Sequence, residues 1–174
     1  LGYLYADEVS MHTAGAPGTY TNALTVASAD NVGNTGHFFA VGDKKIFYTE
    51  STNYGNAPIT SLSGTYEYVV LTGYGSVEDY AALGDALEGR IAVCSRGQLT
   101  FTEKATNAVN AGAVGTIIFN NEPGTINLAL DGYQVKAPCV SISLAEGEYM
   151  KSSAKPVTDQ AGNVLYYLGA VSYT

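Results

Sequence analysis

The sequence predicts a β-rich α/β domain, and three observations lead to this fold class. The 174 residues include 20 Gly and 14 Tyr but no Trp, and Tyr-rich strands separated by Gly turns are typical of sheets. Short apolar, β-branched runs recur between turn sequences along the chain. Residues 90–119 have the pattern of strand, helix and strand, a βαβ unit that predicts parallel, right-handed pairing.

The first part of the chain differs from the rest. Residues 1–35 are expected to form a loop and then one apolar strand at 23–28. A continuously apolar strand is typical of burial on both faces, so it needs neighbouring strands. The sheet to which it belongs is therefore expected elsewhere in a longer protein.

From Gly36 onward the chain is expected to form strands separated by turns and loops. The two longest loops expected are residues 51–64 and 120–135. The expected strands are a hairpin of residues 37–41 and 45–49, followed by 65–71, 90–95, 114–119, 138–143 and 163–169.

Three helices are expected, at residues 76–83, 100–112 and 143–152. The second and third open on Thr-x-x-Glu and Ser-x-x-Glu, capping boxes in which side chains satisfy the first free backbone N–H groups. The second also repeats apolar residues with helical spacing along one face. Its Ala-rich face predicts close packing on the sheet.

The charge of the chain excludes some classes of partner. Eight Lys and Arg stand against 16 Asp and Glu, a formal net charge of −8. Nucleic acids and anionic membranes need clustered Lys and Arg, so neither is expected as a partner. No apolar run reaches the roughly 20 residues that span a bilayer. The opening residues lack a signal peptide, which predicts a cytoplasmic protein or an internal piece of a longer one.

The residues that carry catalytic or metal chemistry are sparse, and no catalytic residue, metal or cofactor is predicted. His12 and His37 lie near no G-x-S-x-G elbow. Gly73-Tyr74-Gly75-Ser76 lacks the Lys of a phosphate loop and predicts a turn. Cys94 and Cys139 stand 45 positions apart in predicted strands, which leaves three interpretations open: buried apolar thiols, a disulfide, or one reactive thiol.

Several tyrosines suggest either a binding surface or strand packing, and the sequence alone does not choose between them. They are Tyr66, Tyr68, Tyr74, Tyr80 and Tyr133.

A series of short motifs resembles the protease-associated (PA) domain over roughly residues 64–153. The order and spacing of the motifs carry the resemblance: Gly89 to Val93, Arg96-Gly97, Phe101 with Glu103-Lys104, Ala111-Gly112-Ala113, Ile117 to Asn121, and Pro138 to Ser143 with Gly147. The resemblance implies an open barrel or sandwich of mixed strands flanked by a few short helices.

Residues 16–31 resemble the buried strand that follows the oxyanion-hole Asn in subtilisin-like serine proteases. Some secreted and cell-envelope proteases of Gram-positive bacteria carry a PA domain inserted at this point. The resemblance implies three parts: residues 1–35 from the catalytic domain, 36–63 as connecting strands and loop, and 64–170 as the PA domain. The catalytic Asp, His and Ser would lie outside this chain, which would itself be inert.

The resemblance implies an extracellular, secreted or cell-wall-attached protease in which this domain gates access or helps recognise protein substrates. Its partners would be that protein or peptide substrate and the rest of the catalytic domain. The residues expected to make the contacts are Tyr74, Arg96, Gly97, Gln98, Asn120, Asn121 and Tyr133. Two other interpretations are a free-standing binding or sorting module and an enzyme in its own right, which would need a nucleophile and base.

Overall fold

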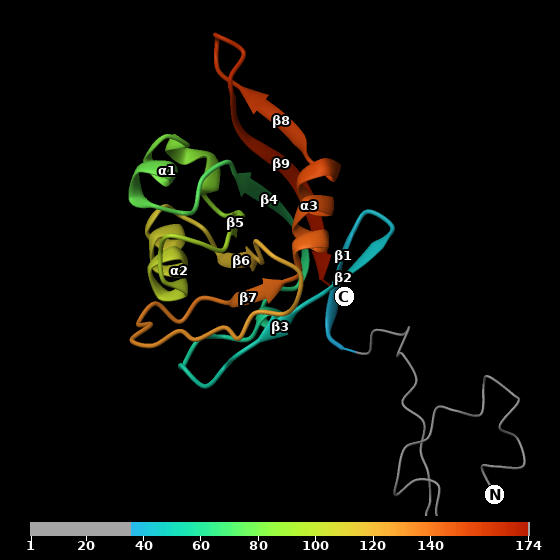
Figure 1. Ribbon diagram of the computed structural model, residues 1–174, viewed down its shortest axis with the longest axis vertical. Coiled ribbons are helices and arrows are strands. Elements are labelled where there is room, and N and C mark those ends of the chain that lie inside the picture. Colours follow the sequence, from blue (N-terminus) through green and yellow to red (C-terminus); the bar gives the residue numbers. More distant parts are fainter. Residues whose placement is uncertain (1–35, 174) are drawn as a thin grey trace, which may run out of the picture. The chain divides into compact units, whose positions relative to one another are not determined.

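The computed structural model describes residues 36–173; the strand expected at 23–28 and His12 lie outside the described residues. The described part contains one nine-stranded mixed sheet in the order β2-β1-β9-β4-β5-β6-β7-β3, with β8 paired to β9 (Figure 1). The strands are β1 (Phe38–Val41), β2 (Lys44–Phe47), β3 (Thr49–Glu50), β4 (Gly64–Leu71), β5 (Ile91–Ser95), β6 (Gly115–Phe119), β7 (Cys139–Ile142), β8 (Lys155–Thr158) and β9 (Val164–Tyr173).

Three helices flank this sheet, α1 (Val77–Ala81), α2 (Phe101–Asn110) and α3 (Leu144–Ser153), together with the 3-10 turns η3 (Ile59–Ser61) and η4 (Gly84–Leu87). Each α-helix begins with a complete capping box, as expected for the second and third. The first helix is shorter than predicted and ends at Ala81. None of the helices in residues 36–173 is long and apolar enough to cross a membrane.

The central part of the sheet is the parallel array β4-β5-β6-β7. The βαβ unit predicted at 90–119 is confirmed as β5, α2 and β6. Strand β9 is longer than predicted and runs antiparallel to β4 over eight residue pairs. The short strand β8 was not predicted, because a four-residue run that contains Pro156 carries little strand signal.

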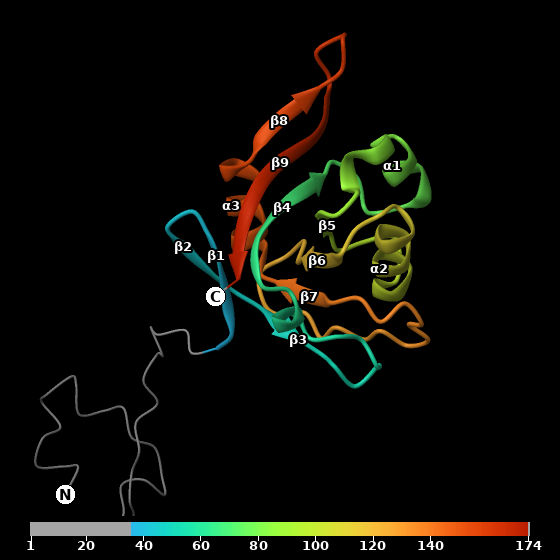
Figure 2. The ribbon, with the colours of Figure 1, turned by 180° about the vertical axis from the view of Figure 1, so that it is seen from behind.

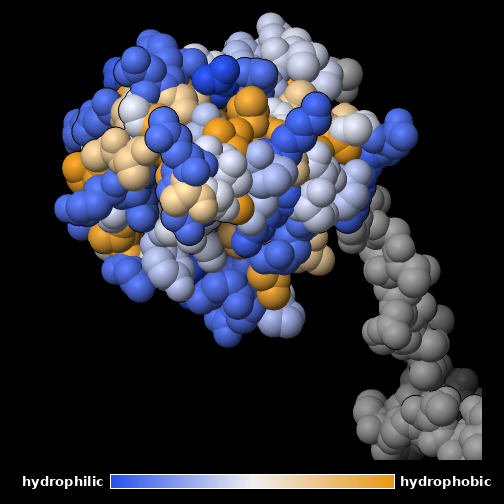
Figure 3. Space-filling view, turned by 90° about the horizontal axis from the view of Figure 1, so that it is seen from above, coloured by the Kyte–Doolittle hydropathy of each residue, from blue (hydrophilic) through white to orange (hydrophobic). Residues whose placement is uncertain are grey.

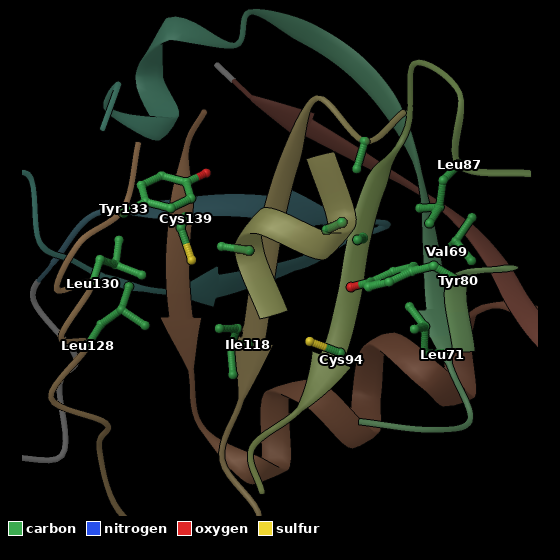
Figure 4. Close-up of a cluster of buried hydrophobic side chains, with 14 of the residues drawn as sticks. Val69, Leu71, Tyr80, Leu87, Cys94, Ile118, Leu128, Leu130, Tyr133 and Cys139 are labelled. Atoms are coloured by element: carbon green, nitrogen blue, oxygen red, sulfur yellow. The ribbon is translucent and has the colours of Figure 1, made fainter. Parts of the chain in front are cut away.

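Side chains of the parallel strands alternate between two separate cores. In β5, Ile91 and Val93 join the core beneath α3, whereas Ala92 and Cys94 join the core beneath α1 and α2. Figure 4 shows the second of these cores, with Cys94 and Ile118 on neighbouring strands. Strands buried on both faces are typical of parallel sheets, which need a covering layer on each side.

The covering layer over the face that packs against α3 comes largely from the sheet itself. The two ends of the strand order, β2 and β3, are consecutive in the chain and are separated only by Tyr48. Strand β2 pairs with β1, and β3 pairs with β7, so one extended segment joins the two ends of the sheet (Figure 2). The expected open barrel of mixed strands with a few short helices is confirmed.

Helix α3 packs closely on this barrel because it carries a glycine at the contact. A Cβ on Gly147 would overlap the ring of Phe119 in β6. The helix is also held by hydrogen bonds from the Tyr68 hydroxyl to the Met150 carbonyl, at 2.8 Å, and from the Phe47 N–H to the Glu146 carboxylate, at 2.9 Å. These contacts connect α3 to the central strands and to the segment that closes the barrel.

The two cysteines are buried and free, which resolves the interpretations left open by the sequence. Cys94 is in β5 and Cys139 is in β7, with β6 between them. Cys94 is level with Ile118 and Cys139 with Thr116, so two strand spacings of about 9.5 Å are a lower bound on the distance between their Cα atoms. A disulfide allows roughly 7 Å. Burial raises the pKa of Cys94 to about 11 and also raises the pKa of Cys139, which argues against a reactive thiol.

We expect Gly147→Ala to destabilise the fold by about 1–3 kcal/mol, because the new methyl group must displace the Phe119 ring. Urea unfolding would measure this loss. The companion change Phe119→Gly removes the Cβ and Cγ atoms that the methyl group would overlap, so the double variant is expected to lose less than the sum of the two single losses. Additive losses would contradict the proposed contact.

The two thiols predict a loss of stability at alkaline pH. Each stays protonated to a higher pH in the fold than in the unfolded chain, so the stability it contributes is complete below about pH 9 and is lost as the pH rises toward about 11. At pH 10 the loss from Cys94 is about 1 kcal/mol. Urea unfolding at pH 7, 9 and 10 measures it.

The variant Cys94→Ala with Cys139→Ala serves as the control for this pH dependence. Its free energy of unfolding is expected to fall less steeply between pH 8.5 and pH 10 than that of the unchanged chain, whatever its absolute stability. Equal slopes would show that the thiols do not cause the alkaline loss.

Candidate binding site at the carboxyl edge of the parallel strands

Three loops that follow parallel strands meet at one edge of the sheet. Tyr74 follows β4, Arg96 follows β5, and Asn120 follows β6. In a parallel array the carboxyl ends of the strands share an edge, which is where α/β proteins commonly build their binding sites. Gly97, Gln98 and Asn121 follow the same strands directly. The fold thus places at one edge six of the seven residues that the sequence analysis expects to make contacts.

Arg96 is held by groups of the β6 loop. Its guanidinium donates to the Asn120 side-chain oxygen and to the Glu122 carboxylate, both at 3.2 Å. The Asn120 side chain is buried, and it also donates to the Gly124 carbonyl at 3.1 Å and accepts from the N–H of Asn121. Asn120 therefore shapes the loop, while the half-exposed Arg96 and the exposed Asn121 face solvent.

The turn after Arg96 has a backbone conformation that favours glycine. Gly97 has φ 127° and Gln98 has φ 58°, and a non-glycine residue at positive φ is uncommon. A Cβ on Gly97 would lie 3.1 Å from Cε1 of Tyr74, so the tyrosine ring packs directly on this glycine. The Gln98 side chain is exposed beside it.

The Tyr74 loop is fixed from beneath by charged groups. The Asp79 carboxylate accepts hydrogen bonds from the backbone N–H groups of Tyr74, Gly75 and Ser76 at 2.9, 2.9 and 3.0 Å. The amine of Lys104, buried in α2, donates to the Tyr74 carbonyl. Burial lowers the pKa of Lys104. Tyr74 is thereby presented at the surface with 39% of it exposed.

An open groove of about 580 Å³ lies beside this loop. It is lined by residues 96–102 and by Ala129 and Asp131 of the β6–β7 loop. Thr102 donates to the Asp131 carbonyl at 3.0 Å and joins the two walls. The groove offers a guanidinium, exposed amide and hydroxyl groups, and backbone at an unusual turn, which suits polar contacts to an extended peptide.

Tyr133 lies apart from the other predicted residues. It is 5% exposed, and Figure 4 shows its ring beside Cys139, at the start of β7. Its hydroxyl donates to the Ala137 carbonyl at 3.2 Å. Tyr68 and Tyr80 are also buried. For these three tyrosines strand and core packing is the right interpretation, and a shared exposed tyrosine surface is not present. Tyr66 is partly buried against the core beneath α3.

Neither a cluster of metal ligands nor a histidine lies at the candidate site in the described part of the chain. His37 precedes β1 and stacks on Tyr48 with ring centroids 6.0 Å apart, separated from β5 by β9 and β4. Within residues 36–173, no three His, Cys, Asp or Glu side chains gather as a metal site. The face seen in Figure 3 is mostly hydrophilic, with scattered apolar residues.

Sequence reasoning missed the residues that support the site from below, Asp79 and Lys104. Lys104 stands three residues after Phe101, which puts it on the buried face of α2. This spacing could have indicated from the sequence that Lys104 is buried. Asp79 stands at the start of α1, and its reach to three preceding N–H groups depends on the path of the loop.

Comparison with known proteins identifies one matching family and several peptidases that are similar in sequence. A family model described as PA domain matches residues 61–150. The minor extracellular protease Vpr of Bacillus subtilis is 31% identical over 144 residues, covering 82% of this chain and 17% of Vpr. Aminopeptidase YwaD of Bacillus subtilis is 41% identical over 96 residues, covering 54% of this chain and 20% of that protein.

A solved structure shares the fold. The zinc aminopeptidase BSAP from Bacillus subtilis has a TM-score of 0.59 and 27% sequence identity, over 78% of this chain and 29% of that one. This chain spans a fifth or less of the length of the two curated relatives.

We expect Asp79→Ala to destabilise the fold by about 2 kcal/mol, because it leaves three backbone N–H groups without their acceptor and removes half of a capping box. Urea unfolding would measure the loss. Glu78→Ala, at the exposed neighbouring position in α1, is the control and is expected to change stability by no more than about 0.5 kcal/mol. Equal effects would contradict the role given to Asp79.

Proposed function

The chain belongs to the PA domain family, and from this premise we propose that it is the non-catalytic part of a larger protease, where it helps recognise protein substrates and restricts access to the active site. A protease-associated role follows from the family itself. The finer role is supported by one observation above all: the segments that follow β5 and β6 line an open groove that includes Arg96, and Tyr74 of the loop after β4 packs on Gly97 beside it.

Arg96 can exchange its contact with Glu122 for contacts with a bound peptide. Its ion pair with Glu122 is exposed, with 40% and 67% of the two side chains accessible. Such a pair contributes about 0.2–1 kcal/mol, so little free energy opposes its replacement. A guanidinium can then bind peptide carbonyls or a carboxylate with several parallel hydrogen bonds. Tyr74, Gln98 and Asn121 supply further exposed groups beside it.

The proposed parent is a secreted, subtilisin-like serine protease, with residues 1–35 as part of its catalytic domain and residues 64–170 as the PA domain. The match to Vpr supports it, because it covers 82% of the chain, more than the family model does. Vpr is extracellular by its name. The pairing of Ala40 with Ser172 supports an insertion, since it places the two ends of the described unit side by side.

A second candidate parent is an aminopeptidase, favoured by YwaD at 41% identity and by the fold of BSAP. The groove would serve the same kind of substrate contact in either parent. The coding sequence on both sides of this chain distinguishes them: catalytic Asp, His and Ser motifs would support the first, and a zinc-binding peptidase domain the second. Residues 16–31 favour the first.

We expect Arg96→Ala in the parent protease to raise KM for a protein substrate about tenfold, because charged hydrogen bonds in the groove are lost. The kcat and KM for a short chromogenic peptide, which reaches only the active site, are expected to stay unchanged. Steady-state kinetics on both substrates would measure this.

Lys155→Ala is the matched control, because it removes one exposed positive charge from β8, outside the groove. Its KM for the protein substrate is expected to stay unchanged. If Arg96→Ala leaves protein and peptide kinetics untouched, or changes both equally, the groove does not recognise substrate.

A further inference from the structure

Helices α1 and α2 enclose a second hollow, the α1–α2 pocket, which is separate from the groove. Its volume is about 390 Å³, within the roughly 300–1,000 Å³ of small-ligand pockets. Thr102 of the groove and Asn107 of the pocket are five residues apart on α2, which puts them about 140° apart around its axis. The pocket is lined by Val77, Tyr80, Ala81, Gly84, Asp85, Asn107, Asn110 and Ala111.

The floor and one wall of this pocket are apolar. Val77 is 63% exposed, more than any other large hydrophobic residue of the described part. Tyr80 is buried, and Ala81 and Ala111 complete the apolar lining. An apolar side chain docked here would cover Val77, and burying a side chain of that size contributes favourably to binding.

The rim of the pocket is polar and acidic. Asp85 lies on it and makes no ion pair with any residue in 36–173, and the same holds for Glu78 on α1. The amide of Asn107 donates to the Gly75 carbonyl at 3.1 Å, which leaves its oxygen as an acceptor. Asn110 is exposed next to it. Acceptors therefore outnumber donors around an apolar floor.

Within residues 72–135, which include α1 and α2, no cation is both exposed and unpaired. Residues 72–135 carry seven acids and three cations. Of the cations, Arg90 pairs with Glu67 at 2.6 Å, Arg96 pairs with Glu122, and Lys104 is buried. The other exposed lysines lie outside this stretch: Lys44 and Lys45 on β2, Lys136 just before β7, and Lys155 on β8. This half of the domain therefore attracts positive charge.

We propose that the α1–α2 pocket docks a segment of the substrate protein in which an apolar side chain stands next to lysine or arginine. The apolar side chain packs on Val77 and Tyr80, and the neighbouring cation pairs with Asp85. The proposal rests on the proposed function in one respect, that the partner is the protein cut by the parent protease. It assigns to that partner a basic, apolar recognition segment.

Fluorescence anisotropy with the whole 174-residue chain tests the pocket. The probe is a labelled ten-residue peptide with one central Leu flanked by Lys. The two matched peptides replace the flanking Lys by Glu, or the Leu by Ser. The Lys–Leu peptide is expected to bind at least tenfold more tightly than either, and the difference from the Glu peptide is expected to shrink in 0.5 M salt because of screening.

Two variants test whether the peptide binds in the α1–α2 pocket. Asp85→Asn is expected to weaken binding about two- to fivefold, the range of an exposed ion pair. Val77→Ser is expected to weaken it up to about tenfold, because the apolar wall is lost. Asp43→Asn removes an equally exposed charge from the β1–β2 turn and is the control, with no change expected.

The results separate this inference from the proposed function. Equal binding of the Lys and Glu peptides, unchanged binding in Val77→Ser, or no binding at all would overturn the docking of a basic, apolar segment. Binding that is lost in Arg96→Ala and kept in Val77→Ser would place the peptide in the groove, which overturns the pocket and leaves the proposed function standing. Kinetics of the parent protease decide the proposed function independently.

Discussion

The requirement to cover both faces of four parallel strands governs the rest of this structure. Strands β4 to β7 are buried on either side, so each face needs a layer of apolar side chains. One layer is supplied by α1 and α2, where Ala105 and Ala108 let α2 lie close to the strands. The other is supplied by α3 and by the curving of the sheet, which the segment through Tyr48 closes.

The same parallel arrangement creates the candidate binding site, because it brings three loops to one end of the sheet. These loops are held in place by buried polar groups: Asn120 orders the β6 loop, and Asp79 and Lys104 order the Tyr74 loop. A buried lysine amine is costly unless it is bonded, and its lowered pKa reflects that cost. The supporting groups keep the exposed ones, Tyr74 and Arg96, in fixed positions.

The groove and the pocket present different charged groups, Arg96 in the groove and Asp85 in the pocket. Within residues 72–135 all acids except Asp79 are exposed, whereas Arg90 and Arg96 are paired and Lys104 is buried. The groove offers hydrogen bonds through Arg96 and exposed amides, and the α1–α2 pocket offers an apolar floor with an acidic rim. The two surfaces lie on different flanks of α2, and the partner that we propose for both is a protein segment.

The sequence by itself determined the elements and much of their pairing, because these depend on local signals. The capping boxes at Thr100 and Ser143, the βαβ unit and the family motifs could all be read from neighbouring residues, and six of the seven candidate contact residues came together as the parallel pairing implied. Tertiary structure alone decided three matters. It put β6 between Cys94 and Cys139, it buried Tyr133, and it joined β2 to β3 as the closure of the barrel. Each depends on strand order and on contacts between residues far apart in the chain, and no local pattern records these.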